Sequence, residues 1–197
     1  MSIGKQAKTL TQHQQDIILK HLETTRYPIR NKVVFLLSFK AGLRAKEIAN
    51  LTWSMVCDSN GNISDTIHLP NIASKGHYSG RIIPLHKRLK EELIELKTSL
   101  SLSDFAEGHI ITTERSSRCS AQTIVNFFQT LYKTIGFEGC SSHSGRRTFI
   151  TTAAKFIGQT GGTLNDVKIL AGHSSLSTTQ RYIEYNTDAQ KRIIDRI

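Results

Sequence analysis

The sequence predicts a mainly α-helical domain with a small antiparallel β-sheet. Apolar residues recur at helical spacing along most of the chain. Only two short β-rich runs, 66–69 and 81–85, lie between clusters of turn residues. A chain of 197 residues with 38% hydrophobic residues can bury one well-packed core and is too short for two comfortable ones. We therefore expect residues 1–197 to form a single domain.

Three helices are predicted before the strands. Thr11 and Gln14 form a capping-box pattern, so a first helix should span about 12–25, with Pro28 ending it. Residues 31–41 are apolar on almost every face and meet Gly42, which predicts a buried helix with a glycine stop. A short helix over 43–51 follows, and the turn cluster 58–62 leads into the two strands, which residues 74–80 join.

The second half of the chain is predicted to be helical. Leucines at 85, 89, 93, 96 and 100 recur at helical spacing with charged residues between them. Ser120 can cap a helix that reaches Ile135 and closes at Gly136. Shorter helices are expected over 146–157, over 164–171 behind a cap at 163–166, and over 178–185. Residues 187–197 should form a tail helix.

Charge and cysteine content narrow the classes of function. Lys and Arg number 26 against 16 Asp and Glu, and the net charge of +10 favours a polyanionic partner such as nucleic acid or an anionic membrane. No run approaches the roughly 18 apolar residues of a membrane span, and the N-terminus lacks the apolar core of a signal peptide. Three cysteines lie far apart, an odd number that suits a reducing compartment. Cys140 and His143 lack a second close pair, so no metal is expected.

Four segments concentrate groups that can bind phosphate: 42–48, 74–76, 143–148 and 170–173. Each has an ordinary explanation when taken alone. An arginine at a helix start is usually solvated, a Lys-Gly pair is usually a turn, and a lone histidine is usually a loop or core residue. Their order and spacing are more informative than any one of them.

Together these segments resemble the catalytic domain of the tyrosine recombinases, or phage integrase family, over about residues 10–186. A G-L-R-x-x-E pattern contains Arg44, and a β-turn ahead of an R-I-I-P-L strand contains Lys75. An H-x-x-R pattern spans His143 to Arg146, and an L-x-G-H-S-S-x-x-T-T-x-x-Y segment ends at Tyr182. The resemblance implies six catalytic residues: Arg44, Lys75, His143, Arg146, His173 and Tyr182.

The implied reaction is attack by the tyrosine hydroxyl on a DNA phosphate, which gives a covalent 3′-phosphotyrosine and a free 5′ hydroxyl. A phenol is only about one part in a thousand ionised at pH 7, so the nucleophile needs help. His143 or its surroundings can accept the proton, while Arg44 and Arg146 stabilise charge on the phosphate. Lys75 can protonate the departing oxygen, and His173 can orient the phosphate. Phosphodiester energy is retained, so no ATP, metal or other cofactor is expected.

Other residues receive secondary roles. Glu47 is expected to fix neighbouring groups, although an exposed helical glutamate is nearly as good an explanation. Tyr185, one turn from Tyr182, competes as nucleophile by position alone. Gly145 stands where the family often has leucine, and we expect looser packing there. Five residues are expected to contact DNA: Lys46, His77, Arg81, Arg147 and Arg181.

The expected protein is a recombinase or integrase of a mobile genetic element in the bacterial cytoplasm or nucleoid. Its partners would be double-stranded DNA and further copies of itself, in a synapse that could be tetrameric. The tail could dock on a neighbouring copy or on its own core. We expect the family's N-terminal core-binding domain to be absent, which a naturally short member or a domain cut from a longer chain would both explain. A catalytically silent DNA-binding regulator and a type IB topoisomerase are the alternatives.

Overall fold

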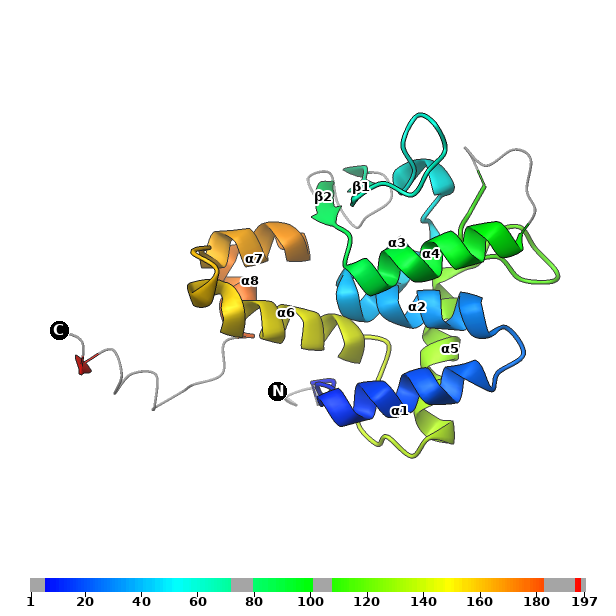
Figure 1. The fold of residues 1–197 in the computed structure, drawn as a ribbon. Coiled ribbons are helices and arrows are strands. Elements are labelled where there is room, and N and C mark those ends of the chain that lie inside the picture. Colours follow the sequence, from blue (N-terminus) through cyan, green and yellow to red (C-terminus); the bar gives the residue numbers. More distant parts are fainter. Residues whose placement is uncertain (1–5, 72–79, 101–107, 183–193, 196–197) are drawn as a thin grey trace.

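The computed structural model describes residues 6–71, 80–100, 108–182 and 194–195 (Figure 1). It confirms a mainly helical fold with a two-stranded antiparallel sheet. The described elements are α1 (Gln12–Glu23), α2 (Pro28–Lys40), α3 (Ala45–Ala49), η1 (Trp53–Met55), β1 (Thr66–Leu69), β2 (Arg81–Pro84), α4 (Lys87–Ser99), α5 (Ala121–Thr134), α6 (Ser144–Phe156), η3 (Ile157–Gln159), α7 (Leu164–Ala171) and α8 (Leu176–Gln180).

The helix boundaries follow the expected caps with a few shifts. The Oγ1 atom of Thr11 accepts a hydrogen bond from the backbone N–H of Gln14 (3.2 Å), and the Gln14 side chain accepts one from Thr11 N (2.9 Å), which is the predicted capping box. Pro28 is the first residue of α2, because proline fits a helix start, where its missing N–H is not needed. Helix α6 begins at Ser144, two residues earlier than predicted. Helix α8 also begins early, and residues 183–185 of its predicted span lie outside the described residues.

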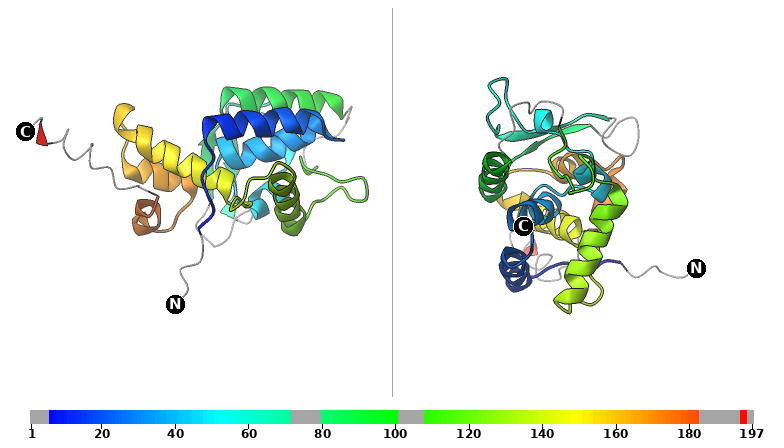
Figure 2. Two further views of the ribbon diagram at one scale, coloured as in Figure 1. Left: turned by 90° about the horizontal axis from the view of Figure 1, so that it is seen from below. Right: turned by 90° about the vertical axis from the view of Figure 1, so that its right-hand side faces the viewer.

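The main core surrounds α2. Helices α1, α2 and α4 run side by side, with α2 between the other two, and α5 crosses on another side (Figure 1 and Figure 2). Residues 33–37 of α2 are all buried, as expected for a helix that is apolar on every face. Phe35, Trp53 and Phe128 are the largest fully buried side chains of the described chain. No helix in the described parts of the chain is long and apolar enough to cross a membrane.

Helix α7 packs beside the second half of α6, and α8 packs against α7 (Figure 1). A smaller hydrophobic cluster forms there. Its buried members are Ile150, Val167 and Ala171, and the partly buried ring of Tyr182 packs against them. The first half of α6 packs against α2, whereas its second half contacts α7. Helix α6 therefore joins the two clusters, and Tyr182 lies at the edge of the smaller one.

Gly145 corrects one expectation about packing. It is buried in the first turn of α6, where α6 meets α2. A Cβ atom at this position would lie 2.6 Å from Ser38 Oγ and 3.1 Å from Ser38 Cβ. The glycine therefore allows close packing of the two helices, and the prediction that it loosens this region was wrong.

The hairpin buries one of its faces. Strands β1 and β2 pair with Thr66 opposite Pro84 and Leu69 opposite Arg81. Ile67, Leu69 and Ile83 point inward and are buried. Arg81 alternates onto the same face as Ile83, so its side chain also points inward. This arginine enters the site described next.

Candidate active site

The C-terminal end of α7 brings three arginine side chains together. The carbonyl groups of residues 170, 171 and 172 accept hydrogen bonds from Arg81 Nε (2.9 Å), Arg146 Nη2 (2.6 Å) and Arg44 Nη2 (3.1 Å), in that order. The last carbonyl groups of a helix have no partner within the helix and form the negative end of its dipole, so cations are stabilised there. We call these three groups the carbonyl end of α7. They collect arginines that come from β2, from α6 and from the residue before α3.

Glu47 connects two of these arginines. Its carboxylate accepts hydrogen bonds from the backbone N–H of Arg44 (2.8 Å) and from Arg44 Nη1 (2.9 Å). The same carboxylate also accepts hydrogen bonds from both terminal nitrogens of Arg81, at 3.0 and 3.1 Å. Burial opposes ionisation of Glu47, but the hydrogen bonds and charges of Arg81 and Arg44 outweigh it, and the pKa lies below its usual value. Glu47 is fully buried, which excludes the alternative of an exposed helical glutamate.

Arg146 is held at both ends of its guanidinium group. Nη1 donates to the carbonyl of Gly42 (2.5 Å), which follows α2, and Nη2 donates to the carbonyl end of α7. Burial, followed by repulsion from Arg44, lowers the pKa of Arg146 to about 9. The group therefore remains a cation at neutral pH. Gly42 has a positive φ of 65°, which a glycine adopts without strain and which turns the chain from α2 toward Arg44.

His173 and Tyr182 face each other beside the arginines. Their rings stack with centroids 5.6 Å apart and an interplanar angle of 25°. His173 Nδ1 lies 3.0 Å from the hydroxyl of buried Thr179 on α8, which fixes the ring orientation. Burial, and then the charges of Arg146 and Arg44, lower the pKa of His173 to about 4. The imidazole is therefore neutral at pH 7.

A cavity of about 420 Å³ opens in front of Tyr182. Three predicted catalytic residues line it together with two of the predicted DNA contacts, and its complete lining is Gln6, Ala7, Ser141, His143, Arg146, Arg147, Thr178, Arg181 and Tyr182. The Arg147 guanidinium carbon lies 6.0 Å from the centroid of the Tyr182 ring. His143 is exposed and precedes the first turn of α6.

The wall formed by Gln6 and Ala7 was not predicted. Two backbone N–H groups hold this N-terminal segment: Lys8 N donates to the carbonyl of Gly139 (3.0 Å), and Leu10 N donates to the side-chain hydroxyl of Thr148 (2.8 Å). The Gln6 side chain also accepts a hydrogen bond from Arg147. No periodicity or motif in residues 6–10 signals this contact, because it depends on where distant segments meet in the fold.

Placement of the remaining predicted residues is mixed. Lys46 and Arg181 are exposed, as a DNA contact requires. Arg81 is not: its side chain is 2% exposed and paired with Glu47, so the expectation that it contacts DNA was wrong. Lys75, His77, Tyr185 and the tail, apart from residues 194–195, lie outside the described residues. Within the described ranges, no group of three or more His, Cys, Asp or Glu side chains could hold a metal ion.

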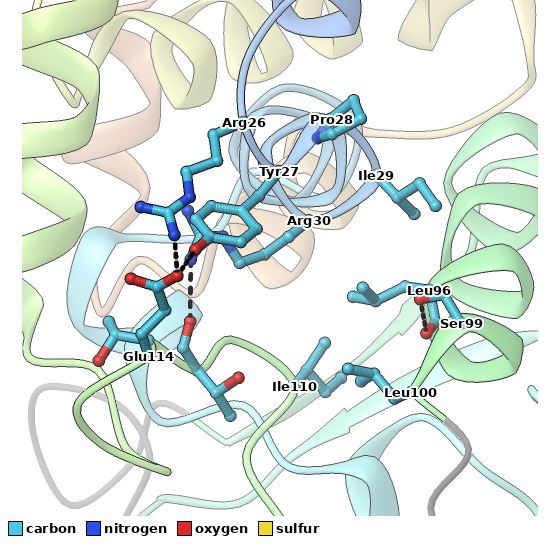
Figure 3. Close-up of a pocket in the computed structure, with 12 residues that line it drawn as sticks. Arg26, Tyr27, Pro28, Ile29, Arg30, Leu96, Ser99, Leu100, Ile110 and Glu114 are labelled. Carbon is cyan, nitrogen blue, oxygen red and sulfur yellow. Dashed lines mark hydrogen bonds and ion pairs between the residues drawn. The ribbon is translucent and has the colours of Figure 1, made fainter.

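A separate cavity of about 360 Å³ lies between the start of α2 and the end of α4 (Figure 3). Ile29, Leu96, Leu100 and Ile110 give it apolar walls. At one side, Glu114 accepts hydrogen bonds from Arg26 and Tyr27. None of the predicted catalytic residues lines this cavity. The candidate active site is therefore the cavity in front of Tyr182, which three of the predicted catalytic residues line.

Known proteins share this sequence pattern and this fold. The Phage integrase family matches residues 8–188. Tyrosine recombinase XerC of Rickettsia bellii is 28% identical over 187 residues, which cover 89% of this chain and 55% of the relative. Tyrosine recombinase XerC of Pelobacter propionicus is 24% identical over 175 residues, 88% of this chain and 54% of the relative. This chain thus spans about half the length of these curated relatives.

Solved structures agree at the level of the fold. A structure of the Tn1549 transposon integrase in complex with a circular intermediate DNA superposes with a TM-score of 0.71 at 17% sequence identity, over 98% of this chain and 67% of that chain. The family match covers every helix and strand named above, from α1 to α8. On this match, the chain belongs to the phage integrase family, the tyrosine recombinases.

Proposed function

We propose that this chain is the catalytic domain of a site-specific DNA recombinase, which cleaves and rejoins DNA strands through a covalent 3′-phosphotyrosine. One observation supports this more than any other: the carbonyl end of α7 gathers three guanidinium groups directly beside the stacked rings of His173 and Tyr182. A nucleophile next to fixed positive charge is the arrangement that attack on a phosphodiester requires.

Arg44 and Arg146 would bind the non-bridging oxygens of the scissile phosphate. A guanidinium group has five N–H donors, and each of these two arginines uses only some of them on protein oxygens. Among the described side chains of this cluster, three guanidinium groups meet the carboxylate of Glu47, so positive charge exceeds negative charge there. Because protein contacts hold these charges before DNA arrives, little reorganisation is needed as negative charge builds on the phosphate.

Proton transfers would then complete the reaction. The oxygen of Tyr182 forms a bond to phosphorus while the bond from phosphorus to the 5′ oxygen breaks. His143, which lines the same cavity, accepts the phenolic proton. Lys75 supplies a proton to the departing oxygen, as the family resemblance implies. Neutral His173 can donate a hydrogen bond to the phosphate if the Thr179 hydroxyl donates to its Nδ1 and leaves the proton on Nε2.

DNA binding and assembly complete the proposal. Exposed Lys46 and Arg181, together with Arg147, would contact the DNA backbone, with His77 alongside Lys75. Strand exchange requires several copies on DNA, and we propose a tetrameric synapse in which the tail of one copy docks on the next. We also propose that residues 1–197 act as one catalytic unit, in the cytoplasm or nucleoid where bacterial DNA lies.

The test is incubation with a nicked suicide substrate, in which loss of a short strand after cleavage traps the covalent adduct. Wild-type protein and the Tyr185→Phe variant should form the adduct, whereas Tyr182→Phe should bind DNA without forming it. Peptide mapping should place the DNA on Tyr182. No adduct from the wild type would favour the silent regulator. Relaxation of supercoiled DNA without strand exchange between two sites would favour the topoisomerase.

A further inference from the structure

Arg81 makes more contacts with the site than its place in the sequence suggests. It begins β2, and its inward side chain crosses from the hairpin to two helices. Its two terminal nitrogens donate hydrogen bonds to the two carboxylate oxygens of Glu47 on α3, and its Nε donates to the carbonyl end of α7. A single side chain therefore joins the element that holds Arg44 to the element that precedes His173.

Gly172 provides an independent sign that this placement is specific. A Cβ atom on Gly172 would lie 2.6 Å from Arg81 Nη1 and 2.9 Å from its Cζ, so only glycine leaves room for the guanidinium group. The residue also has a positive φ of 60° at the end of α7, which glycine adopts without strain. The carbonyl of this same glycine accepts the hydrogen bond from Arg44.

We propose that Arg81 is a positioning residue for DNA cleavage, which acts through Glu47 on Arg44. Glu47 touches the backbone and the guanidinium group of Arg44, so the orientation of its carboxylate sets where Arg44 points. The fork of Arg81 fixes that carboxylate with two parallel hydrogen bonds. This inference rests on the proposed function, because it concerns the same reaction.

The alternative is that Arg81 serves the stability of the fold alone. A buried ion pair is a poor way to stabilise a protein, because removing two charges from water offsets much of their attraction. Well-packed apolar residues would do as well at the loop end of a hairpin, where Arg81 pairs with Leu69. Lysine would keep the charge of Arg81 but could not form the fork or reach three acceptors in one plane. The Arg81→Lys variant therefore tests the hydrogen-bonding geometry of the guanidinium group while the positive charge is kept.

The experiment compares two DNA substrates that differ at the scissile phosphate. One contains the natural phosphodiester, and the other a neutral methylphosphonate, whose transition state has one negative charge fewer and depends less on a well-placed Arg44. Arg81→Lys and Glu47→Gln should slow single-turnover cleavage of the phosphodiester on the order of 100-fold, as misplacement of a reacting group does, and should slow cleavage of the methylphosphonate much less. In an Arg44→Ala background, Arg81→Lys should cause no further loss.

A control variant removes one partner of a second, partly buried ion pair. Lys32 Nζ on α2 lies 2.8 Å from Glu92 Oε2 on α4, and the two side chains are 14% and 11% exposed. Neither residue lines the Tyr182 cavity. Lys32→Met should lower the melting temperature without changing the ratio of the two cleavage rates. If Arg81→Lys behaves like Lys32→Met, with equal losses on both substrates, then Arg81 is structural and the proposal is overturned.

A second measurement does not depend on activity. In a structure of the Arg81→Lys variant, we expect the Glu47 carboxylate to turn and the Arg44 guanidinium to leave the carbonyl of Gly172. An unmoved Arg44 would overturn the proposal, whether or not the chain cleaves DNA. Absence of an adduct from the wild type would instead contradict the proposed function and leave this structural test decisive for Arg81.

Discussion

Arg44 and Arg146 differ in how the protein holds them, although both are expected to bind the same phosphate. The Arg146 residue is 5% exposed and bridges two backbone carbonyl groups, whereas the Arg44 side chain is 27% exposed. Alanine at either position should raise the activation free energy of cleavage by about 3 to 4 kcal/mol, as the loss of one preorganised charge stabiliser does. The cleavage rate should fall accordingly.

The two variants should separate in stability. Arg146→Ala leaves the carbonyl groups of Gly42 and Ala171 buried without their donors, at about 1 to 3 kcal/mol each. Arg44→Ala leaves Glu47 still paired with Arg81 and should change stability little. Urea denaturation measures this difference, and equal losses for the two variants would contradict it.

His173 should make stability depend on pH in a defined window. Burial, then the charges of Arg146 and Arg44, hold its pKa at about 4, whereas an imidazole in an unfolded chain titrates near 6.5. Between these values the unfolded chain binds the extra proton, so folding stability falls as the pH drops from about 6.5 to about 4 and this contribution levels off below that. His173→Gln should remove this part of the acid sensitivity.

The measurement is the melting temperature of both proteins at pH 7 and pH 5. Burial also lowers the pKa of His86 and His109, which act in the same direction and remain in both proteins. The difference between wild type and His173→Gln is therefore the readout. An identical loss on acidification would show that His173 is protonated as readily in the folded protein as in the unfolded chain.

Ser38 and Gly145 form a contact whose energetics can be measured. The Ser38 hydroxyl is buried and has no hydrogen-bond partner within the described part of the chain. Ser38→Ala should therefore raise the free energy of unfolding by up to about 1 kcal/mol. Gly145→Ala should lower it by about 1 to 2 kcal/mol, because overpacking against Ser38 exceeds the gain in helix propensity. The double variant should recover part of that loss.

Ser144 supplies the control for this pair. It is also buried near the start of α6, but its hydroxyl accepts a hydrogen bond from Ser141 N (3.0 Å). Ser144→Ala should destabilise the protein, in contrast to Ser38→Ala. Equal destabilisation by both variants in urea would show that the Ser38 hydroxyl has a partner after all.

At the scale of single elements, α7 depends on its first turn. Asp166 accepts hydrogen bonds from the backbone N–H of Thr163 (2.7 Å) and from its hydroxyl (2.9 Å), and these bonds lower the pKa of the exposed carboxylate. Asp166→Ala should lower the melting temperature at pH 7. The difference from wild type should shrink as the pH falls below the usual range for aspartate, where the carboxylate is protonated in both states.

Asp16 on α1 is the matched control for this cap. It is also exposed but accepts only a hydrogen bond from the Gln12 side chain within the described contacts. Asp16→Ala should change the melting temperature less than Asp166→Ala. The reverse order would show that the cap of α7 contributes little to folding.

Elements with strong periodicity and clear caps could be predicted from sequence. The predicted span of α7, 164–171, agrees with the structure, as does the strand 66–69, because a capping box and β-rich composition mark their ends locally. The start of α6 was placed two residues late, since His143 caps it without any side-chain hydrogen bond that sequence could signal.

Contacts between distant segments could not be predicted. Motif order was enough to propose Arg146, His173 and Tyr182 as neighbours, and the structure does bring these three together. The inward turn of Arg81 was missed, because a lone arginine at the start of a strand usually faces solvent. Nothing local reveals that Glu47 and a helix end, far away in sequence, offer it three acceptors.

At the scale of the whole molecule, a net charge of +10 should make DNA binding strongly dependent on salt. Each phosphate that the protein neutralises releases counterions, so the slope of log affinity against log salt should be about −0.9 per contact. Lys46→Ala should reduce this slope by about one contact. Lys32→Met, which removes a charge already paired inside the protein, should leave the slope unchanged. DNA binding that does not depend on salt would mean that the basic side chains of the protein do not contact the DNA phosphates.

The hydrogen bonds at the end of α7 also constrain how many residues this helix can have. At its start, the backbone N–H of Thr163 donates a hydrogen bond to Asp166, and in its middle Val167 is buried in the smaller hydrophobic cluster. Each of its last carbonyl groups accepts a hydrogen bond from a different arginine. One residue added between these points would rotate the carbonyl groups by about 100° and advance them by about 1.5 Å. Each guanidinium group would then face the wrong oxygen. Insertions and deletions should therefore be tolerated in the turn at 158–162, and the eight-residue span of α7 should resist them.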